Sequence, residues 1–134
     1  SGVIRSAIQA VVDVGGDVGS GAKGVVIGVL QGTKASGKEA LQAISETTSN
    51  VVKETSDVTG DIAKAAKGAV QGAIAGAKEI SLDTTEAASA AATGALKAAE
   101  QISSKAAQQV RKAVTGTIAG VKVVLKEPFK SNKS

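Results

Sequence analysis

The charged residues of this 134-residue chain avoid part of an eleven-residue frame that runs along almost its whole length. Counted in elevens from residue 1, all sixteen basic and all twelve acidic side chains fall at positions 1, 2, 5, 6, 9 and 10. Positions 3, 4, 7, 8 and 11 carry no charge and hold most of the apolar residues. Eleven residues make three α-helical turns, so these five positions form one face about 130° wide. We call this face the charge-free strip.

The strip predicts an all-α protein of long, amphipathic, Ala/Gly-rich helices. A half-buried β-strand needs apolar and polar residues in alternation, and the charges do not follow that period. Valine and threonine are frequent and favour helices only weakly, so contact with other helices or with a surface must stabilise these helices.

Repeats of 22 and 44 residues are built on this frame. Segments that begin at residues 15, 37, 59, 81 and 103 each open with Gly, Thr or Ser, and the first, third and fifth are the most alike. Three architectures fit the pattern: an extended helix, a right-handed coiled coil, or an antiparallel helical bundle. Because the frame persists from Val3 to Phe129 without a shift, it favours long helices over helices that fold back every 22 residues.

Glycines and capping signals divide the chain. Capping-box spacing joins Ser36 to Glu39 and Asp83 to Glu86, and Thr59 is a further candidate N-cap. The predicted divisions are an N-terminal apolar helix over 1–14, a Gly-rich hinge over 15–21, a repeat helical region over 22–127 with breaks near 36, 59 and 82, and a basic tail over 128–134.

Basic residues border the strip on one side. The net charge is +4, and position 1 of the frame, next to the strip, is mostly basic. Lysine stems can lie along an apolar surface while their ammonium groups reach anionic groups in water. The residues predicted to contact a lipid or anionic surface are Lys23, Lys34, Lys67, Lys78, Arg111 and Lys122.

Glycines four residues apart recur on the other side of the helix. Glycine inside a helix costs up to about 1 kcal/mol relative to alanine, so a repeated pattern calls for a cause. Small residues at this spacing let two helix backbones approach closely. The residues predicted to make helix–helix contacts, within one chain or between chains, are Gly24, Gly28, Gly32, Gly68, Gly72, Gly76, Gly116 and Gly120.

Composition argues against an enzyme. The chain has no cysteine or histidine and a single aromatic residue, Phe129. The common zinc sites, thiol chemistry, Ser–His catalysis and base-stacking surfaces are therefore excluded, and no phosphate-binding glycine loop occurs. We expect no cofactor, no metal, no nucleic acid and no small-molecule substrate. No uncharged run is long enough to span a membrane, so we expect a cytoplasmic protein or one associated with a membrane or particle surface.

Three segments resemble known eleven-residue amphipathic repeats: VTGTIAGVKVV, AKGAVQGAIAGAKE and VVKETSDVTGDIAKAAKG. Their pattern is similar to that of α-synuclein, perilipins, group 3 late-embryogenesis-abundant proteins and exchangeable apolipoproteins. The likeness extends over residues 3–126 as a pattern; the KTKEGV-type core of α-synuclein and the proline punctuation of the apolipoproteins are absent. This resemblance implies reversible adsorption to lipid or another apolar surface, and in some cases protection under stress.

The sequence therefore carries three functional hypotheses. The first is a non-enzymatic protein whose helices bind a lipid or particle surface reversibly through the charge-free strip. The second is a self-associating helical bundle or scaffold, a homo-oligomer packed through its Gly-xxx-Gly faces. The third is a stress-protective or ice-interacting helix. Ice binding would need threonines at one fixed position of the frame, and this chain does not have them.

Overall fold

The computed structural model describes residues 18–32, 37–58 and 61–125, and this part of the chain is an all-α bundle with one short β-hairpin. The helices are α2 (Val18–Gly32), α3 (Gly37–Asp57), α4 (Ile62–Glu79), α5 (Thr84–Ile102) and α6 (Ser104–Val114). The hairpin is formed by β1 (Gly116–Ile118) and β2 (Val121–Val123).

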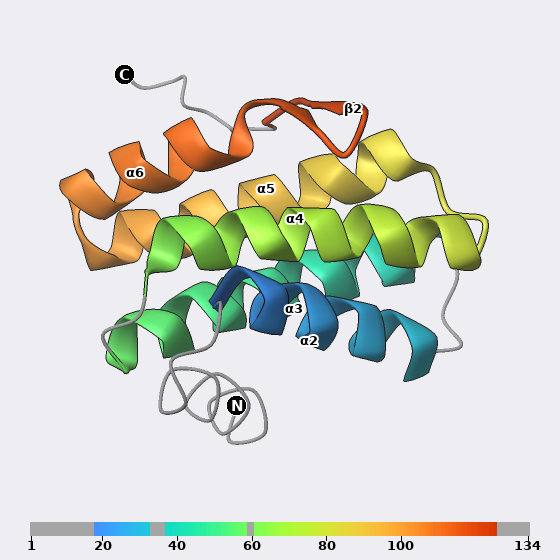
Figure 1. Cartoon of the computed structure of the whole chain (residues 1–134), viewed down its shortest axis with the longest axis horizontal. Helices are drawn as coiled ribbons and strands as arrows, with labels where there is room; N and C mark the ends of the chain where they lie inside the picture. The colour runs from blue at the N-terminus through green and yellow to red at the C-terminus, as the bar shows by residue number, and fades with distance from the viewer. Residues whose placement is uncertain (1–17, 33–36, 59–60, 126–134) are drawn as a thin grey trace.

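The helices lie in layers (Figure 1). α2 and α3 form one layer, α4 and α5 the next, and α6 with the hairpin covers the far side of α4 and α5. α2 and α4 run in the same direction, because their contact partners advance together: the backbone of Gly19 lies against Gly68, and that of Lys23 against Gly72. Consecutive helices run in opposite directions, so the chain folds back at every connection.

Side-chain caps set where three of the helices begin. An oxygen of Asp61 accepts a hydrogen bond from the backbone N–H of Lys64, and Asp83 does the same for Thr85 and Glu86. Ser103 ends α5 and caps α6, where its hydroxyl accepts from the backbone N–H of residue 106. Each cap satisfies backbone donors that have no partner inside the helix. The capping signal at Asp83 is confirmed, whereas Ser36 and Thr59 lie outside the described residues.

The core is made mostly of small side chains. Alanine supplies most of the buried residues of α4 and α5, and the larger buried side chains include Leu30, Ile44, Ile74 and Leu96. Small side chains bring helix axes close together but bury little apolar area per residue. α4 and α5 are the central helices, since each packs against an outer helix, against the other and against α6.

Several sequence predictions are wrong in this structure. The preference for long continuous helices fails, because α2 to α5 are separate helices that fold back on one another. Residues 18–21 of the predicted hinge are helical and begin α2. The predicted helical region over 22–127 ends early, since the chain leaves α6 after Val114 and turns into the hairpin. The predicted segments 1–14 and 128–134 lie outside the described residues.

The hairpin forms because two residues adopt positive φ. Ala119 has φ of 51° and Gly120 has φ of 81°, which is the pattern of a two-residue type I′ turn. Ile118 pairs with Val121 across this turn, and Gly116 pairs with Val123. Ile118 and Val123 are buried, so the hairpin covers the end of the core.

Candidate functional site

The charge-free strip lies inside the bundle. Nearly all buried apolar side chains of the five helices occupy strip positions, and the exceptions are three alanines, Ala65, Ala87 and Ala98. The charged side chains of the described residues are exposed, apart from the half-buried Glu54. The surface that the sequence assigns to a lipid contact is therefore the interior of the folded protein.

The glycine run of α4 packs against α2. A Cβ added at Gly72 would lie 2.5 Å from the carbonyl oxygen of Lys23, and one at Gly68 would overlap the backbone of Gly19. A Cβ at Gly76 would meet Leu30, 2.5 Å from its Cδ1 and 3.3 Å from its Cβ. At Gly68 and Gly72 the space is taken by the backbone of α2, and at Gly76 it is taken by the side chain of Leu30. We call this contact the α2–α4 seam. Gly94 of α5 is similarly close to the backbone of α3.

The other predicted contact glycines are placed differently. Gly24, Gly28 and Gly32 are exposed on α2, and a Cβ on any of them would meet no described atom within 4 Å. Gly116 and Gly120 belong to the hairpin, where positive φ explains them. Within the described part of this chain, these five glycines therefore make no close helix–helix contact, and contact between chains at these positions stays a prediction. For the three glycines of α2 the physical reason is position, because they lie on a side of α2 that no described element covers, whereas the glycine run of α4 faces α2.

The predicted surface lysines and arginine are spread over several elements. Lys23 is on α2, Lys67 and Lys78 are on α4, Arg111 is on α6, and Lys122 is on β2, all exposed. Lys34 lies outside the described residues. Lys78 is in the last turn of α4, and Lys67 is three turns earlier on the same side of that helix, so these two lysines are separated along α4.

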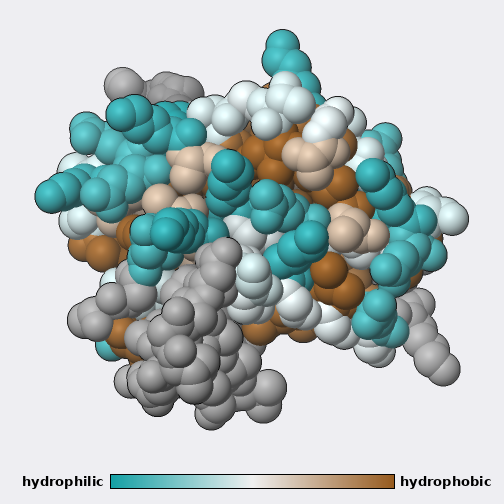
Figure 2. All heavy atoms as spheres, viewed as in Figure 1, coloured by the Kyte–Doolittle hydropathy of each residue, from teal (hydrophilic) through white to brown (hydrophobic). Residues whose placement is uncertain are grey.

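One open groove gathers three basic side chains, of which only Lys67 is predicted from the sequence as a contact residue. It runs between α4 and α6, encloses about 350 Å³ and brings together Lys64, Lys67 and Lys112. Its remaining lining residues are Ala63, Ala113, Thr115, Thr117 and Ile118. We call it the α4–α6 groove. Figure 2 shows hydrophilic side chains over α6 and the adjoining half of α4. Lys64 and Lys112 lie away from the strip border in the frame, so only the packing of α6 on α4 reveals the cluster.

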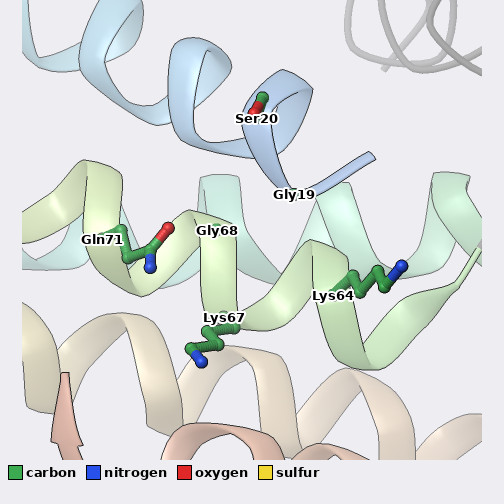
Figure 3. A pocket seen from close by; sticks show the side chains of 6 residues that line it. All are labelled: Gly19, Ser20, Lys64, Lys67, Gly68 and Gln71. Carbon is green, nitrogen blue, oxygen red and sulfur yellow. The ribbon is translucent and has the colours of Figure 1, made fainter. Parts of the chain in front are cut away.

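A second hollow continues on the other side of α4. Lys64 and Lys67 also line it, together with Gly19 and Ser20 of α2 and Gln71 of α4. In Figure 3, Lys67 points away from α2, toward the layer that holds α6. The two lysines therefore stand on the ridge of α4 between the hollows, and both are exposed.

The described residues also bear on metal binding and on membrane crossing. Within 18–32, 37–58 and 61–125, no cluster of acidic side chains could hold a metal ion. No described helix has both the length and the apolar character that crossing a membrane requires. What the described surface offers is charge, arranged around an apolar interior.

Comparison of the chain with protein-family models, with curated proteins and with solved structures found no match. The functional argument therefore depends on the geometry of the bundle and on the chemistry of its side chains.

Proposed function

We propose that this protein is a non-enzymatic bundle that opens and adsorbs reversibly to lipid or another apolar surface. In this proposal the layer of α2 and α3 separates from the layer of α4 and α5. The strip residues that face one another in the bundle then lie on the apolar surface instead. The observation that carries the proposal is the burial of the charge-free strip, because the same helix face serves as a core when closed and as an adsorbing face when open.

The small size of the core residues supports reversible opening. Apolar burial stabilises by about 25 cal/mol per Å², and an alanine-rich core loses less per residue on opening than a leucine-rich core would. The helices need not unfold, since an apolar surface can replace the contacts that helix packing supplies. Charged side chains that are exposed in the closed bundle would stay in water in the open form.

A disulfide across the α2–α4 seam tests the proposal. The distance of 3.3 Å between the Leu30 Cβ and a Cβ on Gly76 is a few tenths of an ångström short of the usual range for a disulfide. The chain has no cysteine of its own, so the double variant Leu30→Cys/Gly76→Cys forms a single defined bond. We expect the oxidised protein to stay off oil droplets coated with phosphatidylcholine, and the reduced protein to float with them.

The reduced form of the same variant is the matched control, because it carries the same loss of the leucine side chain. A second variant reports on opening without altering the core. Gln31 and Glu79 share an exposed side-chain hydrogen bond between α2 and α4, so spin labels on Gln31→Cys/Glu79→Cys start close together. We expect the label distance to increase on the droplets. Equal flotation of oxidised and reduced protein, or adsorption with the label distance unchanged, would contradict the proposal.

A further inference from the structure

We propose that the α4–α6 groove docks the closed bundle on the anionic headgroups of a phospholipid membrane. This inference rests on the proposed function and adds to it the first contact, made before the layers separate. Docking needs a site that is exposed while the strip is still buried, and the α4–α6 groove meets that condition.

The lining of the groove suits a phosphate group. Lys64 and Lys67 of α4 stand opposite Lys112 of α6, and no carboxylate is among the residues that line it. All three lysines are exposed, and none forms a salt bridge with a carboxylate of the described residues. Thr117 adds a hydroxyl group at the hairpin side, so the groove offers both positive charge and a neutral hydrogen-bond donor. The hydroxyl of Thr115 is not available as a second donor, because it donates to the carbonyl oxygen of Arg111.

Charge is distributed unevenly over the molecule, so that the side with the α4–α6 groove turns toward an anionic surface. α6 and the hairpin carry four basic residues and no acidic residue: Lys105, Arg111, Lys112 and Lys122. The acidic residues of α3 are Glu39, Glu46, Glu54 and Asp57, against two lysines. Asp61 is the acidic residue nearest to Lys64 in sequence; its carboxylate caps the start of α4 and is not among the groups that line the groove. An anionic surface therefore attracts the α4–α6 side and repels the α3 side.

The same features favour a membrane over a nucleic acid. The residues from 18 to 125 that the structure describes include no aromatic side chain on which a base could stack. The floor of the groove is apolar, formed by Ala63, Ala113 and Ile118, and three lysines are few for the phosphate tracking that nucleic-acid grooves perform. Phospholipid headgroups present separate phosphates above an apolar layer. The lysines of the groove can contact these phosphates one by one, and its apolar floor suits the apolar layer beneath them.

Charge reversal on the locked bundle tests the inference. The oxidised Leu30→Cys/Gly76→Cys protein is mixed at low salt with vesicles of phosphatidylcholine alone or with added phosphatidylglycerol. We expect binding to the anionic vesicles only, weakened at least about tenfold by Lys64→Glu/Lys67→Glu/Lys112→Glu and lost in about 0.5 M salt. The matched control is Lys38→Glu/Lys53→Glu/Lys97→Glu, which makes the same change in net charge at exposed sites on α3 and α5.

The outcomes separate this inference from the proposed function. Equal loss of binding in both triple variants would show that net charge alone determines binding, and it would overturn the assignment of the α4–α6 groove as the docking site. Tighter binding to a short single-stranded RNA than to vesicles would also overturn that assignment. Direct binding of inorganic phosphate without any vesicle binding would identify a free anion as the ligand and would also overturn the inference. Opening on neutral droplets does not depend on these lysines, so the spin-label distance measured on those droplets tests the proposed function separately. Circular dichroism of each variant verifies that the fold is retained.

Discussion

Thr48 places a hydroxyl in the bundle interior with no hydrogen-bond partner among the described residues. A buried hydroxyl without a partner costs stability, whereas a methyl group of the same shape costs none. We expect Thr48→Val to raise the free energy of unfolding by about 1 kcal/mol. Urea unfolding followed by circular dichroism measures the change.

Thr55 is the matched control for this substitution. It is equally buried on the same helix, but its hydroxyl donates to the carbonyl oxygen of Val51 at 2.7 Å. Thr55→Val removes a satisfied hydrogen bond, so we expect it to give no comparable gain in stability. If both substitutions stabilise equally, the cause is added apolar volume, and the unpaired hydroxyl of Thr48 is not a site of lost stability.

At the scale of elements, equivalent glycines in two helices are expected to respond oppositely to alanine. Gly72 of α4 lies in the α2–α4 seam, where a Cβ would press on the backbone of Lys23. We expect Gly72→Ala to destabilise the protein by about 1–3 kcal/mol, because neither backbone can move aside freely. Gly28 of α2 is exposed with open space around it, so Gly28→Ala should stabilise by up to about 1 kcal/mol through helix propensity. Thermal unfolding of both variants would contradict the packing of the seam if the two changes had the same sign.

The glycine runs show which part of the packing a sequence can reveal. The spacing of Gly68, Gly72 and Gly76 indicates a helix that allows close approach, but the run in α2 has the same spacing and faces outward. The difference arises because α4 sits between two layers, and that location depends on the whole topology. The hairpin could not be predicted for a similar reason. Ile118 occupies a strip position and is buried, as it would be on a helix, so its place in the pattern does not distinguish a helix from a strand.

At the scale of the whole molecule, the strip predicted the interior but not the chain path. Every strip residue needs an apolar partner. An apolar surface under one long helix supplies that partner, and so do neighbouring helices in a folded bundle. The connections that decide between them are brief: α4 ends at Glu79 and α5 begins at Thr84, with Ser81 at a positive φ of 59°. The capping box at Asp83 predicts a break near 82, but a serine at positive φ is not recognisable as a turn from the sequence, so the direction of the chain after the break could not be predicted. The α4–α6 groove depends on the same folding back of the chain, so it could not be predicted from the sequence either.

We expect α2 to be less stable than α4 and α5, the central helices of the bundle. It contains five glycines in fifteen residues, each up to about 1 kcal/mol less favourable than alanine in a helix. It has no acidic residue in its first turn and no basic residue in its last turn, whereas α4 has the Asp61 cap and Lys78. Its main packing partner is α4, while α4 and α5 are held from several sides.

Native-state hydrogen exchange should therefore detect an opening that involves α2 before the global unfolding of the bundle. We expect the slowest amides of α2 to exchange with an opening free energy below that of the slowest amides in α4 and α5. The double variant Gly24→Ala/Gly28→Ala should raise the value for α2 and narrow the gap, because it adds helix propensity at exposed sites without touching the seam. A single opening free energy shared by α2, α4 and α5 would mean that the layers separate only by unfolding together. The layer that contains α2 would then not open before the rest of the bundle.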